Sequence, residues 1–214
     1  MKPYPGYLFD LDGTLVDTAL DINAALNFAL SRHGYREVSE ALTRHWIGHG
    51  AKVLVEQAFG YQQKPQDEAE PVLREFLDYY AAHAADLSQP YPAVVDALGS
   101  LRDRGAALAV VTNKVTTFSI TILEALDLAR HFDTVVCGDT TATPKPAADP
   151  ALHACGALGL APQDALFVGD SQTDVLCARA AGCPVVCVRN GYNHGVPAEQ
   201  LGADAVIESF SDLV

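Results

Sequence analysis

Short apolar runs alternate with stretches of helical periodicity along most of this 214-residue chain. Each run is rich in β-branched or aromatic residues and is bounded by Gly, Asp or Thr, which is typical of a strand buried on both faces. The repeated strand–helix order predicts a doubly wound α/β fold with a mostly parallel sheet and right-handed crossovers. The predicted strands span residues 7–9, 108–111, 134–137, 165–168 and 185–188, and the helices between them span residues 92–104, 117–126, 150–158 and 173–181.

One segment interrupts this order. Between residues 17 and 87 no convincing strand is found, and four amphipathic helices are predicted instead, the first capped by Asp17 or Thr18 and the second by Ser39. An all-helical insertion after the first strand indicates a small α-helical cap on a Rossmann-like core, and the proline-containing segment 88–92 suits the return linker. The expected domains are residues 1–16 with 91–214 for the core and 17–90 for the cap.

Composition narrows the classes of function. The chain has 14 basic against 27 acidic residues and a net charge of −13, which disfavours nucleic-acid binding because phosphate backbones attract basic surfaces. An anionic substrate therefore needs a local positive site. No signal peptide or apolar run of membrane-spanning length is found, and the five cysteines form no Cys-x-x-Cys pair. We expect a cytoplasmic protein with reduced cysteines that contacts no membrane, as a monomer or homodimer.

Acidic residues follow two of the predicted strands. Asp10 and Asp12 come directly after the first strand, and Asp170 and Asp174 follow the strand at 165–168. Residues two apart in a strand share a face, so Asp10 and Asp12 are expected to point at the same place. Converging carboxylates repel each other, and a hard divalent cation is the obvious partner. We expect Mg²⁺, bound by the side chains of Asp10 and Asp170 and by the backbone carbonyl of Asp12.

Further polar residues follow another strand or precede a helix. Thr112 and Asn113 follow the strand at 108–111, and Lys145 lies in a loop ahead of a helix. In an open α/β sheet the ligand crevice lies beyond the carboxyl ends of the strands, so these residues are expected to meet the acids at one edge. Lys145 would neutralise Asp10 and a transferring phosphoryl group, and Thr112 and the Asn113 backbone would donate hydrogen bonds to phosphoryl oxygens.

This set of residues suits phosphoryl transfer. Asp10 is the candidate covalent nucleophile, because carboxylates are known to accept phosphoryl groups. Asp12 would protonate the leaving oxygen and later activate water against the aspartyl-phosphate. Asp174 would hold a metal-bound water or orient Lys145.

The same residues resemble the haloacid dehalogenase-like superfamily, in its phosphatase branch. The matching motifs lie at residues 10–17, 112–114, 145–146 and 169–174 and span almost the whole chain in the family's order and spacing. The resemblance implies a small α-helical cap for the insertion, and it implies the roles given above for Asp10, Asp12, Thr112, Lys145 and Asp170. Dehalogenases of this superfamily lack the second aspartate of the first motif, so the presence of Asp12 favours phosphate chemistry.

The predicted cap also carries a candidate specificity loop at residues 44–51. This stretch is similar to a Trp-hydrophobic-Gly-x-Gly-Ala segment of phosphoglycolate phosphatases. Gly48 and Gly50 permit a tight turn and close approach to a ligand, with His49 between them, and Arg44 could meet a substrate carboxylate. The alternative is an ordinary helix–helix connection with a solvated histidine.

The expected function is therefore a Mg²⁺-dependent phosphatase for a small phosphorylated metabolite, with 2-phosphoglycolate the leading candidate. A sugar-phosphate phosphatase, for example for N-acetylmuramic acid 6-phosphate, and a β-phosphoglucomutase-like enzyme are alternatives. A receiver-type signalling domain would be shorter and would lack the helical insertion. A non-catalytic phosphometabolite sensor would usually have lost Asp10 or Asp12. A cap nucleophile at Lys52 is a further alternative, and residues 192–194 are expected to form a surface loop.

Overall fold

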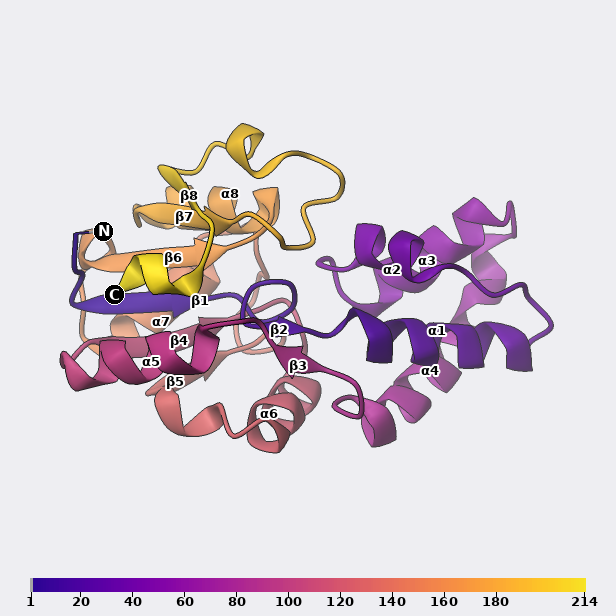
Figure 1. Cartoon of the computed structure of the whole chain (residues 1–214). Coiled ribbons are helices and arrows are strands. Elements are labelled where there is room, and N and C mark those ends of the chain that lie inside the picture. The colour runs from indigo at the N-terminus through magenta and orange to yellow at the C-terminus, as the bar shows by residue number, and fades with distance from the viewer. Residues whose placement is uncertain (1) are drawn as a thin grey trace.

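A six-stranded parallel sheet forms the centre of the computed structural model, which describes residues 2–214 (Figure 1). Its strands are β1 (Gly6–Phe9), β4 (Ala107–Val111), β5 (Thr134–Val136), β6 (Ala165–Gly169), β7 (Val185–Val188) and β8 (Ala205–Ile207). They lie in the order β5-β4-β1-β6-β7-β8, and every neighbouring pair is parallel. The predicted doubly wound α/β fold is confirmed. All five predicted strands are present, and β8 extends the sheet beyond them.

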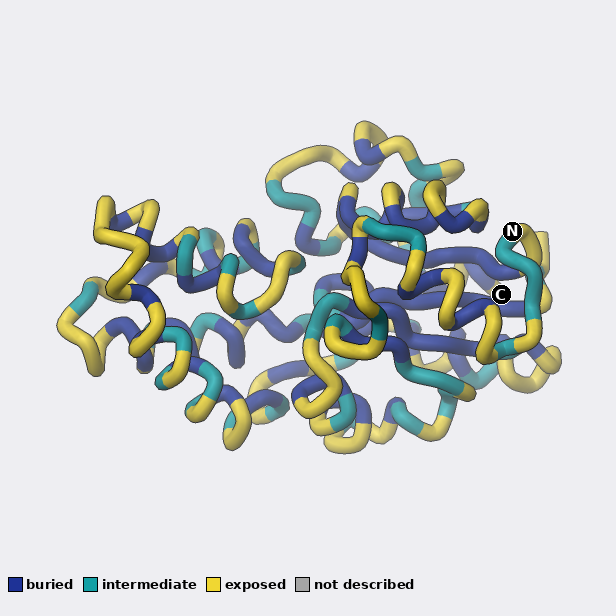
Figure 2. The backbone as a smooth tube through the Cα atoms, turned by 180° about the vertical axis from the view of Figure 1, so that it is seen from behind, coloured by how far each residue is buried: buried dark blue, intermediate teal, exposed yellow. Residues whose placement is uncertain are grey.

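Helices pack on both faces of the sheet, so its strands are buried on both sides (Figure 2). Successive side chains of β1 point to opposite faces. Tyr7 and Phe9 belong to an apolar cluster that includes residues of α5, whereas Leu8 belongs to a second cluster with residues of α7 and α8. The core helices are α5 (Val94–Asp103), α6 (Thr116–Ala125), α7 (Asp149–Leu158) and α8 (Gln172–Ala181).

The register of the central strands brings their carboxyl ends to one level. Phe9 of β1 lies opposite Val110 of β4 on one side and opposite Val168 of β6 on the other. The next residue, Asp10, donates its backbone N–H to the Val168 carbonyl at 3.0 Å. The residues that follow β1, β4 and β6 are thereby held at the same edge of the sheet, as the sequence predicts.

The helical insertion leaves and rejoins the core through two short strands. β2 (Val16–Asp17) pairs antiparallel with β3 (Gln89–Pro90), and the helices between them form a separate lobe in Figure 1. We call the chain between these strands the cap. The division of the chain into domains at residues 17 and 90 stays a prediction. The cap helices are α1 (Ala19–Arg32), α2 (Glu40–Trp46), α3 (Ala51–Tyr61) and α4 (Ala69–His83).

The ends of the cap helices agree in part with the sequence-based expectations. The Ser39 hydroxyl accepts the Leu42 N–H at 3.3 Å and so caps α2 as predicted. At the start of α1, Thr18 makes no side-chain cap, and Asp17 accepts the Ala19 N–H at 3.3 Å instead. Helix α3 continues through Gly60, where an end was predicted. None of the helices within residues 2–214 has the length and apolar character needed to cross a membrane.

A buried carboxylate joins the first helix of the cap to the segment that follows its last helix. Asp21, in the first turn of α1, is 2 % exposed. Its oxygens accept hydrogen bonds from the backbone N–H groups of Leu87 and Ser88 and from the Ser88 hydroxyl, at 2.6 to 3.1 Å. Because these donors are buried or partly buried, they depend on Asp21 for their hydrogen bonds.

Replacing Asp21 by Ala leaves these donors unpaired and should lower the free energy of unfolding by about 2–4 kcal/mol. For a chain of this length, the Tm should fall by roughly 2–4 °C per kcal/mol. Thermal unfolding followed by circular dichroism measures the shift. Asp78→Ala removes an exposed acid of α4 and is the matched control, with a change of less than about 0.5 kcal/mol expected. Equal Tm values for the two variants would refute the role given to Asp21.

Candidate active site

A cleft lies between the cap and the carboxyl edge of the sheet. The core side of the cleft is polar and contains Asp10, Asp12, Thr112 and Asn113, whereas the cap side is largely apolar. Ligands of open α/β sheets bind at this edge, beyond the ends of the strands. The predicted site residues therefore gather at the place where the topology favours binding.

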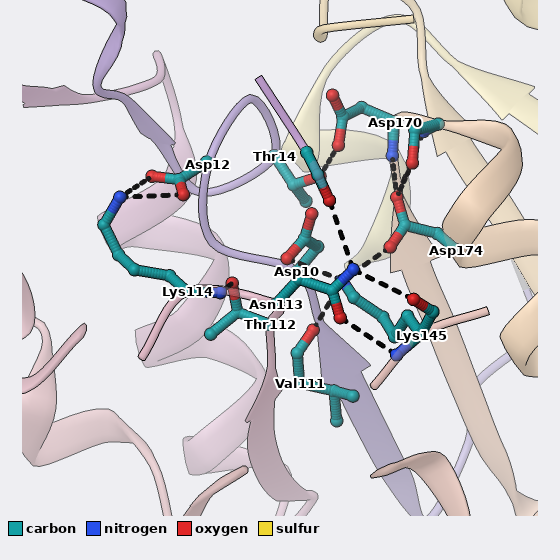
Figure 3. Close-up of polar contacts among 12 residues, drawn as sticks. Asp10, Asp12, Thr14, Val111, Thr112, Asn113, Lys114, Lys145, Asp170 and Asp174 are labelled. Atoms are coloured by element: carbon teal, nitrogen blue, oxygen red, sulfur yellow. Dashed lines mark hydrogen bonds and ion pairs between the residues drawn. The ribbon is translucent and has the colours of Figure 1, made fainter. Parts of the chain in front are cut away.

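Lys145 lies beneath the cleft and joins carboxylates from two strand ends (Figure 3). Its ammonium is 2.7 Å from Asp10 Oδ1 and 2.7 Å from Asp174 Oδ1, and it donates to the Val111 carbonyl at 2.9 Å. The Lys145 side chain is only 2 % exposed. Burial acts to lower the pKa of Lys145, but the carboxylates of Asp10 and Asp174 outweigh it and raise the pKa, so the lysine is charged. It is a fixed positive charge beside Asp10.

Asp174 lies in the first turn of α8, and both of its carboxylate oxygens accept hydrogen bonds. Its Oδ1 atom meets Lys145, and its Oδ2 atom accepts hydrogen bonds from the backbone of Asp170 and from the backbone and hydroxyl of Ser171, at 2.7 to 3.2 Å. Ser171 and Asp174 form a capping box, which fixes the first turn of the helix. These contacts suit the predicted role of Asp174 in orienting Lys145.

Three carboxylates of this site converge closely enough to hold one cation. One oxygen atom from each of Asp10, Asp170 and Asp174 lies within 4.8 Å of the other two. Burial raises the pKa of Asp10 to about 7 against the opposing effect of Lys145, with Asp174 adding to the rise. Burial, Asp174 and Asp10 also raise the pKa of Asp170 well above its usual value. The single positive charge of Lys145 thus does not balance the three carboxylates. A hard divalent cation fits their all-oxygen donor set.

Asp12 lines the same cleft as Asp10, but its carboxylate does not join this group. Strand β1 ends at Phe9, so both aspartates lie in the loop beyond it, where strand alternation no longer applies. The Asp12 carboxylate turns to the ammonium of Lys114, at 2.9 and 3.0 Å (Figure 3), and accepts the Thr18 hydroxyl at 2.7 Å. Its side chain is separate from the carboxylates that can hold a cation.

Thr112 and Asn113 lie where the sequence predicts, directly after β4. Thr112 is buried and lines the cleft. The Asn113 side chain exchanges hydrogen bonds with the backbone of Lys145, at 2.9 and 3.0 Å, and donates to the Gly48 carbonyl of the cap at 3.1 Å. Asn113 therefore fixes the lysine loop and also contacts the cap, a contact that sequence reasoning did not anticipate.

The four predicted specificity residues of the cap divide into two pairs. Gly48 and Gly50 line the cleft, with φ angles of 125° and 87° that favour glycine. Arg44 pairs with Asp17 at 2.9 Å and with Glu40 at 2.7 Å, outside the set of residues that line the cleft. His49 stacks against the ring of a core histidine, His194, with the ring centroids 5.0 Å apart. This geometry supports a specificity role for the glycines more than for Arg44 or His49.

Tyr192 lies in a segment that was expected to be a surface loop, and this expectation is wrong for the tyrosine. It is 4 % exposed, and its backbone N–H donates to Asp170 Oδ2. Its hydroxyl donates to Asp17 at 2.6 Å and accepts the N–H groups of Thr18 and Ala19 at 2.9 and 3.0 Å. A long irregular connection after β7 returns to the site here, and no local pattern in the sequence signals such a return.

Comparisons with known proteins place the chain in a family. A family model described as haloacid dehalogenase-like hydrolase matches residues 7–188. Phosphoglycolate phosphatases from Shigella dysenteriae serotype 1 (strain Sd197) and Escherichia coli (strain K12) are each 39 % identical over 228 residues, which cover 98 % of this chain and 90 % of theirs. The crystal structure of a predicted phosphoglycolate phosphatase from Haemophilus somnus 129PT has a TM-score of 0.93 at 37 % identity, covering 100 % of this chain and 97 % of that one.

These matches agree with the fold. The family match includes the loops that carry Asp10, Thr112, Lys145 and Asp170. The resemblance stated from the motifs is thus confirmed, and so is the expectation of a hydrolytic enzyme. This chain belongs to the haloacid dehalogenase-like hydrolases.

Proposed function

We propose that this chain is a Mg²⁺-dependent phosphatase that hydrolyses a small phosphorylated metabolite, most favourably 2-phosphoglycolate, through an aspartyl-phosphate. The observation that carries the proposal is the buried group of Asp10, Lys145, Asp170 and Asp174, of which Asp10 lines the cleft. A nucleophilic carboxylate, a fixed cation and an all-oxygen donor set are the parts that phosphoryl transfer needs.

Asp10 is the proposed nucleophile. It lines the cleft and is fixed from two sides, by its backbone bond to Val168 and by the ion pair with Lys145. Attack of its carboxylate on phosphorus forms the acyl-phosphate bond and breaks the bond to the leaving oxygen. Lys145 compensates negative charge on the carboxylate and on the phosphoryl group, and Thr112 is placed to donate to a phosphoryl oxygen.

Asp12 is the proposed acid and base. Its carboxylate lines the cleft on the side away from Asp170 and Asp174, where a leaving group would exit opposite the nucleophile. It would protonate the departing oxygen, and it would then take a proton from the water that hydrolyses the acyl-phosphate. The contacts with Thr18 and Lys114 hold the carboxylate in place for both steps.

Mg²⁺ is the proposed cofactor, held by the carboxylates of Asp10 and Asp170 and by the backbone carbonyl of Asp12. When bound, it compensates the charge of the phosphoryl oxygens and so permits a phosphate ester to approach a carboxylate. Thr14 and the Tyr192 N–H each donate to an oxygen of Asp170 and orient this ligand. Asp174, with both oxygens engaged, acts by positioning Lys145.

The proposal for the substrate is supported by the two phosphoglycolate phosphatases at 39 % identity over almost the whole chain. A sugar-phosphate phosphatase and a β-phosphoglucomutase-like enzyme are the alternatives, and a panel of phosphorylated metabolites separates them. Release of free phosphate identifies a hydrolase, whereas an isomerised sugar phosphate identifies a mutase. The five cysteines are free and buried, which supports a reducing compartment, and we infer the cytoplasm.

Asp10→Asn should lower phosphate release by on the order of 10⁴-fold or more, because the amide is not a nucleophile for phosphorus. The side chains have nearly the same shape, so the circular dichroism spectrum should match that of the wild type. Steady-state assays with 2-phosphoglycolate and Mg²⁺ measure the loss. An Asp10→Asn enzyme with wild-type turnover would dispose of the covalent mechanism.

Asp12→Asn should still allow some phosphorylation of Asp10 but should slow hydrolysis of the phosphorylated enzyme, because no base activates water. Acid quenching followed by mass spectrometry should detect a phosphoryl group on Asp10 in the variant. The rate of phosphate release should fall by about 10²–10⁴-fold. If the variant neither accumulates phosphoenzyme nor turns over more slowly, Asp12 does not have the assigned role.

Without metal, the stability of the protein should depend on pH through Asp10. Its pKa is raised from 3.8 to about 7 in the folded state, so between these values the folded protein keeps a proton that the unfolded chain has released. The free energy of unfolding should therefore fall as pH rises from 4 to 7, by up to about 1.4 kcal/mol per pH unit from this group. Saturating Mg²⁺ stabilises the ionised form and should remove the fall.

Urea unfolding in excess chelator, at several pH values between 4 and 8, measures this dependence. The difference between wild type and Asp10→Asn reports the titration of Asp10 together with its effect on Asp170, because the amide does not titrate. A difference that is flat, or that rises with pH, would contradict the raised pKa of Asp10.

A further inference from the structure

The wall of the cleft away from the cation-binding carboxylates is apolar, apart from two groups. Its apolar residues come from the cap and from the start of α6, and they include Ile22, Leu54, Phe76, Leu77, Val115 and Phe118. The two polar groups are Lys114, between β4 and α6, and Tyr80 of α4. In the chemistry proposed above Lys114 only holds the Asp12 carboxylate, and Tyr80 has no part.

Lys114 places a fixed positive charge beside the proposed position of the leaving oxygen. Its side chain is 7 % exposed, and its ammonium lies 2.9 and 3.0 Å from the two oxygens of Asp12. Burial acts to lower the pKa of Lys114, but the ion pair with Asp12 outweighs it and raises the pKa. Because Asp12 faces the leaving oxygen in the proposed mechanism, Lys114 lies next to whatever group is attached beside that oxygen.

Tyr80 places a hydroxyl group beside the Lys114 ammonium. The residue is 2 % exposed, and its hydroxyl makes no well-aligned hydrogen bond with the residues of the 2–214 range, although Lys114 is close enough to act on its pKa. Burial raises the pKa of Tyr80 to about 12, so the hydroxyl stays protonated at neutral pH and can donate. The Lys114 ammonium lies 5.0 Å from the centroid of its ring. Because an ammonium group can only donate hydrogen bonds, the proton of the Tyr80 hydroxyl stays available to a ligand.

We propose that Lys114 and Tyr80 together recognise a carboxylate carried next to the esterified carbon of the substrate. The proposal rests on the phosphatase function and names the two residues that would select a small phosphorylated carboxylic acid in that same cleft. A cation and a neutral donor match the two oxygens of a carboxylate, and the apolar surroundings strengthen both interactions by excluding water.

The same wall disfavours a sugar phosphate. The hydroxyl groups of a sugar would lose hydrogen bonds to water and would meet mainly apolar side chains. Arg44 is less suited than Lys114 to the carboxylate, since Lys114 lines the cleft whereas Arg44 pairs with Asp17 and Glu40 outside the cleft lining. Lys114 belongs to the core and Tyr80 to the cap. The carboxylate site is therefore complete only when the cap lies against the core.

Two substrates that differ in one group test the assignment. 2-Phosphoglycolate carries the carboxylate, and 2-hydroxyethyl phosphate has a hydroxymethyl group in its place. The ratio of their kcat/KM values should favour the acid in the wild type. Lys114→Met should lower this ratio by about 100-fold and Tyr80→Phe by about 10-fold, as expected for hydrogen bonds to a charged group. Both substrates are assayed with one preparation, so incomplete folding of a variant does not alter the ratio.

Two matched control variants change a lysine and a tyrosine of the cap that do not line the cleft. Lys52→Met removes a lysine that is 77 % exposed and pairs with Glu56. Tyr79→Phe removes the hydroxyl of the neighbouring tyrosine on α4, whose ring stacks on Phe28 with the centroids 4.2 Å apart. Neither should change the ratio. Calorimetric titration of Asp10→Asn with 2-phosphoglycolate should likewise show weaker binding when Lys114→Met is added.

The outcomes separate this inference from the proposed function. If Lys114→Met and Tyr80→Phe lower hydrolysis of both substrates equally, or if the wild type does not prefer the acid, the carboxylate site is refuted. Hydrolysis of p-nitrophenyl phosphate by the wild type would then leave the phosphatase function standing. If the wild type releases phosphate from none of these esters, the proposed function fails, and the inference that rests on it fails with it.

Discussion

The ion pairs of Lys145 determine the arrangement of the whole site. One buried ammonium lies between Asp10, after β1, and Asp174, at the start of α8, and also bonds to the end of β4. Carboxylates that are buried this closely would repel each other without a compensating charge. The lysine balances only part of the negative charge, and the carboxylates of Asp10, Asp170 and Asp174 lie close enough together to hold a cation. The positions of β1, β4 and β6 in the sheet are what make this contact possible.

The cap completes the cleft from the opposite side. Asn113 fixes the Lys145 loop and donates to the Gly48 carbonyl, so one side chain contacts both the catalytic floor and the cap. The cap wall is mainly apolar, which strengthens interactions between charges in the cleft. The proposed chemistry is carried by residues of the core, and the proposed selection of the substrate involves Lys114 of the core and Tyr80 of the cap.

The sequence predicts those parts of the molecule that depend on local pattern and on topology. Apolar runs predict five of the six strands, and the rule that ligands bind beyond strand ends brings Asp10, Thr112 and Asp170 to one edge. The direction of the Asp12 side chain cannot be predicted in this way, because it depends on a loop beyond the strand and on the ion pair with Lys114. The place of Tyr192 cannot be predicted either, because it depends on the path of a long connection. Strand β8 is missed although its apolar run is as long as β5, which is predicted.

Tyr192 connects two segments that are far apart in the sequence, the loop at Asp170 and the start of the cap. Its backbone contacts Asp170, and its hydroxyl binds the first turn of α1, where the cap begins. A displacement of the loop around Asp170 must therefore move the base of the cap or break these bonds. By thermodynamic linkage, whatever favours one cap orientation also favours the arrangement of the Asp170 loop that goes with it, and the reverse holds equally. The contacts of Tyr192 therefore couple the base of the cap to the loop that holds Asp170.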